Sequence, residues 1–152
     1  MSRNRVLAAA LLAFALIALV GGSVAGAKLI KKKFHGGVTI NYEKNLTGTD
    51  RFFGTVTSAK HRCVGGALVE LGFRPAFEGG GSSNVARTIV ASTHADANGN
   101  WEIFYEVSPS PSYDFASFSA SSPKRTLNTR KRGVVIVCKF QTSEVKTISP
   151  GP

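Results

Sequence analysis

Residues able to do acid–base or metal chemistry are few and scattered in this sequence of 152 residues. The three histidines, His35, His61 and His94, lie far apart along the chain. His61 and Cys63 have the spacing of a metal-ligand pair, but a disulfide at Cys63 would remove the thiolate that binds a metal. We therefore predict neither a metal site nor a cofactor.

The segment Asp96-Ala97-Asn98-Gly99-Asn100 places side-chain oxygens at alternating positions, as calcium loops do. It lacks the later bidentate glutamate, and its glycine stands at the fourth position instead of the sixth. Asn and Gly accept the positive φ of a tight turn, and Asp96 can hydrogen-bond the backbone just beyond itself. We interpret the segment as the turn of a β-hairpin.

Serine, histidine and aspartate are all present, but no arrangement of them indicates catalysis. The sequence contains no Gly-x-Ser-x-Gly nucleophile elbow and no recognisable pair of catalytic carboxylates. A small hydrolase would need a pocket in which a serine or an aspartate meets one of the histidines. We predict that the protein is not an enzyme.

Positive charge is the most distinctive property outside the expected core, because the formal net charge is +10. The segment from 121 to 132 holds five cations and no acid. These are Lys124, Arg125, Arg130, Lys131 and Arg132. Together with the lysines of segment 28–33, they could contact an anionic cell-envelope polymer or acidic glycan by charge alone. A solvated loop explains the same residues, and the missing interleaved aromatics argue against a specific nucleic-acid partner.

Aromatic residues after the turn offer an alternative function, a carbohydrate-binding module. Trp101, Phe104 and Tyr105 could furnish a stacking platform. However, Trp101, Ile103 and Tyr105 alternate on one face of the expected strand and are best placed in the core. Phe104 is then the ring that faces outward.

The first 27 residues have the features of a helical signal peptide. A basic start is followed by the apolar run 6–20 and by Ala25-Gly26-Ala27, a small-residue cleavage site. A retained membrane anchor is the alternative. Cleavage would release a secreted, extracellular chain with no membrane segment, which we expect to be a monomer. We expect residues 28–37 and 141–152 to be flexible tails.

The cysteine count favours one disulfide. Cys63 and Cys138 are the only two cysteines, and an even pair in an exported protein is most simply bonded. Two separate buried thiols are the other interpretation. A bond between them would close a loop of about 75 residues.

Seven short segments have strand-like composition or alternation, and they are separated by turn signals. They cover residues 38–42, 51–58, 67–74, 85–93, 101–107, 113–118 and 133–140. No segment after residue 27 has helical periodicity. The pattern predicts an all-β domain over residues 38–140, built as a seven-stranded antiparallel sandwich of two sheets.

The order of several short motifs resembles a known family. The motifs are Phe52-x-Gly54-x-Val56, Cys63, Ala67-x-Val69-x-Leu71, Thr93 to Trp101 through Asp96-Ala97-Asn98-Gly99, and Tyr113 to Phe118. In this order they resemble the carboxypeptidase regulatory-like or transthyretin-like (prealbumin-like) β-sandwich domains of exported bacterial proteins, which have an immunoglobulin-like architecture.

The resemblance covers residues 38–140 and implies an accessory, binding or structural module without catalytic residues. The sequence departs from the pattern at His94-Ala95-Asp96, in the Gly79–Ser83 insertion and in the basic loop 124–132.

Overall fold

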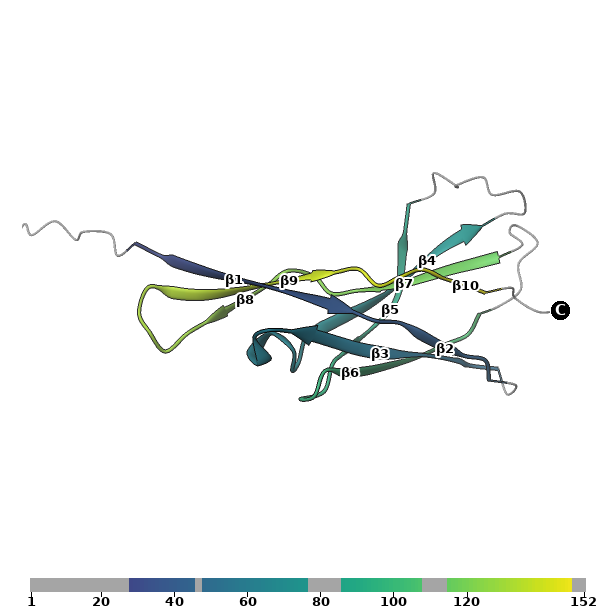
Figure 1. The fold of residues 1–152 in the computed structure, drawn as a ribbon. Coiled ribbons are helices and arrows are strands. Elements are labelled where there is room, and N and C mark those ends of the chain that lie inside the picture. Colours follow the sequence, from purple (N-terminus) through teal and green to yellow (C-terminus); the bar gives the residue numbers. More distant parts are fainter. Residues whose placement is uncertain (1–27, 46–47, 77–85, 108–114, 149–152) are drawn as a thin grey trace, which may run out of the picture.

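The computed structural model describes residues 28–45, 48–76, 86–107 and 115–148, and it arranges them in two β-sheets (Figure 1). The predicted signal peptide and the Gly79–Ser83 insertion lie outside the described residues. The described part contains ten strands and one short 3-10 turn, η1. In chain order they are β1 (Ile30–Val38), β2 (Asn41–Glu43), β3 (Asp50–Ser58), η1 (His61–Cys63), β4 (Leu68–Ala76), β5 (Thr88–His94), β6 (Asn100–Tyr105), β7 (Phe115–Ser121), β8 (Arg125–Asn128), β9 (Val134–Gln141) and β10 (Lys146–Ile148).

The strands form a six-stranded and a four-stranded sheet. The larger sheet has the order β2-β3-β1-β9-β8, and β6 pairs with the other side of β3. The smaller sheet has the order β10-β7-β4-β5. The predicted all-β, two-sheet sandwich is confirmed. The count of seven wholly antiparallel strands is wrong, because β1, β8 and β10 form in segments expected to be tails or loop and β1 runs parallel to β9.

The core lies between the two sheets, where the inward-facing apolar side chains of both sheets meet. Phe52 of β3 and Phe118 of β7 are fully buried, and their ring centroids are 4.6 Å apart. Leu71 of β4 and Trp101 of β6 are also buried. Alternation predicted that Leu71 and Trp101 face the core on β4 and β6, and both predictions are confirmed.

β5 departs from the predicted alternation. Strict alternation would place Ile89 on the same face as Ala91, but Ile89 is 44% exposed and Val90 packs against the core. The register between β4 and β5 shifts between Leu71 and Gly72, where the pairing partner changes from Ala91 to Ile89. This bulge adds one residue to β5, and the inward position passes to Val90.

The two segments expected to be flexible tails contain strands. β1 pairs with β9 through eight residue pairs, from Ile30 with Val134 to Gly37 with Gln141. β10 pairs with β7, and Ile148 is buried there. The prediction of tails relied on charge and polarity, whereas strand pairing uses backbone groups that every one of these residues has.

We call residues 30–35 of β1, all of β8 and residues 134–139 of β9 the basic arm. In Figure 1 these three strands run together away from the rest of the sandwich. The inner face of the arm has its own small cluster, in which Ile136 packs with the two cysteines, flanked by Phe34, Leu127 and Phe140. The predicted disulfide is confirmed, since Cys63 and Cys138 are bonded with their Cα atoms 5.6 Å apart.

Replacing both cysteines by alanine should lower the free energy of unfolding by about 2–5 kcal/mol, because the bond closes a long loop of the unfolded chain. Urea unfolding monitored by tryptophan fluorescence measures this difference. The reduced wild-type protein is the matched control and should lose a similar amount. A loss below about 1 kcal/mol in both would contradict a stabilising role.

The Asp96–Gly99 turn has the predicted local structure but a different place in the fold. One carboxylate oxygen of Asp96 accepts the backbone N–H groups of Asn98 and Asn100, each at 2.8 Å. Gly99 has φ of 93°, and a Cβ there would lie 2.3 Å from the carbonyl oxygen of Val56. However, β5 and β6 belong to different sheets, so the turn is a connection across the sandwich and the predicted hairpin is wrong.

The ionised Asp96 carboxylate should stabilise the folded protein at neutral pH and lose this effect in acid. Hydrogen bonds from the Asn100 side chain and backbone hold the pKa of Asp96 below its ordinary value. This contribution is complete above the unfolded-state pKa of about 3.9 and is lost as pH falls through the lower folded-state pKa. Asp96→Ala should therefore lower Tm by a few degrees at pH 7 and by clearly less at pH 2. Glu144→Ala is the control, and an equal Tm difference at both pH values would count against the ionised turn.

Candidate functional site

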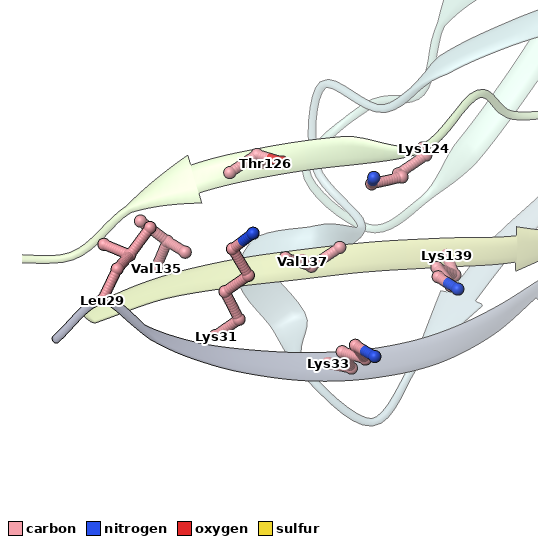
Figure 2. A pocket seen from close by; sticks show the side chains of 8 residues that line it. All are labelled: Leu29, Lys31, Lys33, Lys124, Thr126, Val135, Val137 and Lys139. Carbon is pink, nitrogen blue, oxygen red and sulfur yellow. The ribbon is translucent and has the colours of Figure 1, made fainter. Parts of the chain in front are cut away.

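Four lysines surround a hollow of about 420 Å³ on the outer face of the basic arm (Figure 2). Lys31 and Lys33 come from β1, Lys139 comes from β9, and Lys124 stands just before β8. Leu29, Thr126, Val135 and Val137 complete the lining. We call this feature the lysine hollow.

Strand register explains why these lysines share one face. Lys31 is the partner of Val135, and Lys33 is the partner of Val137. Because side chains alternate across a strand, both lysines lie on the outer face, whereas Lys32 between them lies on the opposite face. The cluster thus depends on β1 being a strand in this register beside β9.

The floor of the lysine hollow is apolar and covered. Val137 faces outward, yet only 5% of it is exposed, so the flanking side chains must shield it. Lysine can cover apolar surface with its alkyl stem while its ammonium stays in water. In Figure 2 Lys31 and Lys33 lie on one side of Val137, and Thr126 and Lys124 lie on the other. The ammonium groups therefore surround a well-packed apolar surface centred on Val137.

The charge of the chain is strongly segregated toward this arm. Segments 28–42 and 115–143 contain ten of the 19 lysines and arginines, and neither contains an aspartate or a glutamate. Among the described residues, the ion pairs join Arg51 to Glu43 and to Glu102 on β2, β3 and β6. None of the four lysines of the hollow has an acidic partner there. Their field is therefore not neutralised locally.

The five cations predicted to contact a polyanion divide into three groups in space. Lys124 lines the lysine hollow. Arg125 is turned to the other side, where its Nη1 donates to the carbonyl oxygen of Gly65 at 2.9 Å. The remaining three, Arg130, Lys131 and Arg132, are exposed in the turn between β8 and β9.

Lys139 was not singled out from the sequence, although its outward position on β9 follows from alternation with Cys138. The N-terminal lysines were predicted to act with the loop, and the hollow brings Lys31 and Lys33 beside Lys124. The sequence pattern did not reveal that β1 and β8 both pair with β9.

A second hollow, of about 580 Å³, is lined by β2, β3 and β6 of the larger sheet and reaches the end of β5 and the Asp96 turn. We call it the polar hollow. From the six-stranded sheet, its lining includes Asn41, Arg51, Phe53, Thr55, Asn100 and Glu102. Thr93 and His94 of β5 and Asp96 of the following turn also line it. Arg51 donates to Glu43 at 3.0 Å and to Glu102, and its Cζ lies 4.6 Å from the Phe53 ring centroid. The hydrogen bonds to Glu102 and Glu43 raise the pKa of Arg51 above its usual value.

The aromatic residues after the turn divide as expected. Trp101 is 4% exposed and belongs to the core, so its indole face is not a surface platform. Phe104 is 59% exposed and is the partner of Arg51 across β3 and β6. Phe104 therefore stands on the outer face near the polar hollow.

The remaining candidates for metal or acid–base chemistry are the cysteines and the histidines. Cys63 is bonded to Cys138, so it offers no thiolate to a metal beside His61. The described residues include no group of three or more His, Cys, Asp or Glu side chains that could hold a metal ion. His35, His61 and His94 lie on β1, η1 and β5 respectively. Of the three, His94 lines the polar hollow, and Asp96 lines the same hollow.

The chain matches no protein-family model, no curated protein and no solved structure. The likeness to carboxypeptidase regulatory-like or transthyretin-like domains therefore stays a prediction from the sequence. Within residues 28–148, as far as the structure describes them, no helix is long and apolar enough to cross a membrane. The disulfide is compatible with an oxidising compartment.

Because Arg125 is hydrogen-bonded to Gly65 and Lys124 lines the open hollow, replacing each should affect stability differently. Arg125→Ala should cost about 1–2 kcal/mol of stability, because it removes a charged donor and leaves the Gly65 carbonyl without that hydrogen bond. Lys124→Ala removes the same charge from the open hollow and should change stability by less than about 0.5 kcal/mol. Urea unfolding of both variants provides the comparison. Equal losses would contradict the distinction.

Proposed function

We propose that the protein is a secreted, non-enzymatic β-sandwich module that binds an anionic polymer at the cell exterior through its basic arm. The observation that carries this proposal is the lysine hollow, where four lysines converge and no acidic residue belongs to the lining. The signal peptide predicted from the sequence and the disulfide between Cys63 and Cys138 support export to an oxidising compartment.

The chemistry of the lysine hollow favours recognition by charge over recognition of a particular group. All four of its cations are lysines, which act as compact point charges and lack the planar fork with which arginine holds a carboxylate or phosphate. No aromatic residue lines it, so bases have no stacking surface there. A flexible polyanion can follow such a face, and its affinity should depend strongly on salt.

A carbohydrate-binding module is the second candidate. The exposed Phe104 ring and the polar hollow beside it favour this function. Buried Trp101 leaves a small stacking surface, and the charge of the basic arm is not needed for a neutral sugar. We therefore rank neutral-glycan binding below polyanion binding.

Binding to heparin and to polyphosphate should weaken steeply with salt. With three or four ionic contacts, raising salt from about 50 to 200 mM should reduce affinity on the order of 30- to 100-fold. Lys33→Glu combined with Lys124→Glu should reduce affinity at low salt at least tenfold and lower the slope of log K against log salt by about two. Fluorescence anisotropy with labelled polymer measures both effects.

The control for this experiment is Lys44→Glu combined with Arg74→Glu, which makes the same change in net charge away from the arm. Lys44 and Arg74 are both exposed. This control should lose much less affinity than the arm variant. Equal losses in the two double variants, or no binding to either polymer at low salt, would refute the proposed function.

A further inference from the structure

The lysine hollow and the polar hollow lie on the same face of the six-stranded sheet. Lys31, Lys33, His35 and Gly37 occupy successive outward positions along β1, and Gly37 is the partner of Thr57 on β3. From Thr57 the same outward face continues along β3 to Phe53. The two hollows are therefore joined by one surface, although they come from different parts of the sheet.

The outward positions between the two hollows hold no lysine, arginine, aspartate or glutamate. His35 and Gly37 of β1 and Thr57 of β3 occupy these positions. The strand path from Lys33 to Phe53 spans eight residue steps, which corresponds to roughly 25 Å at 3.3 Å per residue. A compact anion cannot reach both hollows, but an extended chain molecule can.

The polar hollow suits hydroxyl groups better than anions. Arg51 is already engaged by two carboxylates, those of Glu43 and Glu102, so this end of the face has no surplus positive charge. The Glu102 carboxylate can accept hydrogen bonds from hydroxyl groups, and the amides of Asn41 and Asn100 can both accept and donate them. The exposed Phe104 ring adds an apolar surface beside them. This combination of groups can hold the polar edge and the apolar face of a neutral sugar.

Resting on the proposed function, we propose that the anionic polymer is an acidic polysaccharide in which charged and neutral sugars alternate. The chain lies lengthwise on the outer face of the six-stranded sheet. Its carboxylates are held by Lys31, Lys33, Lys124 and Lys139, while a neutral sugar occupies the polar hollow against Phe104. A denser polyanion would be repelled by Glu43 and Glu102 and would occupy the basic arm alone.

The experiment compares hyaluronate, in which charged and neutral sugars alternate, with polyphosphate, which contains no sugar. The full chain is titrated with each labelled polymer at about 150 mM salt, close to physiological ionic strength. Phe104→Ala should weaken hyaluronate binding roughly three- to tenfold, in the range of one aromatic contact, and leave polyphosphate binding unchanged. Asn41→Ala is a second variant at an exposed position and should also weaken hyaluronate binding alone.

Val145→Ala is the matched control, because it removes an exposed apolar side chain from the connection between β9 and β10. It should change neither affinity. If Phe104→Ala and Asn41→Ala leave hyaluronate binding unchanged while Lys33→Glu with Lys124→Glu weakens both polymers, the polysaccharide inference is wrong and the proposed function stands. If neither polymer binds even at low salt, both are wrong.

Discussion

The eight residue pairs that join β1 to β9 hold together the surface on which the protein's candidate function depends. They place Lys31 and Lys33 beside Val135 and Val137, and β8 on the far side of β9 adds Thr126 opposite Val137. At its other end β1 pairs with β3, through Gly36 to Val38. A single strand therefore connects the basic arm to the part of the sheet that carries the polar hollow.

The inner face of the arm is attached to the sandwich through the segment around η1. The disulfide joins Cys63 of η1 to Cys138 of β9. Beside it, Arg125 donates to Gly65, and Arg62 Nη2 donates to the Asn128 carbonyl at 3.2 Å. These links run from one short segment to both β8 and β9. They keep the arm in place although the main core lies elsewhere.

Gathering positive charge on three neighbouring strands opposes folding, because like charges repel across short distances. The structure limits this cost by leaving the ammonium groups in water, where the dielectric constant is high. Val137 is nonetheless covered, so the same side chains also contribute packing. An anionic polymer would relieve the repulsion on binding, which links the charge pattern to the proposed function.

The sequence alone determined those features that depend on local chemistry. Alternation identified the buried faces of β4 and β6, because side-chain direction in a strand has a period of two residues. A single cysteine pair left one possible intramolecular disulfide, and the Asp96 turn followed from its residue types. Tertiary structure decided what depends on distant partners. The lysines of 28–33 became a strand through backbone groups of β9, and the bulge opposite Leu71 exchanged Ile89 for Val90.

The grouping of Lys31, Lys33, Lys124 and Lys139 likewise required β1, β8 and β9 to be neighbours. The sequence therefore showed that the chain is basic and all-β. Only the fold decided which cations share a face, because strand pairing is a long-range contact that local residue patterns do not encode.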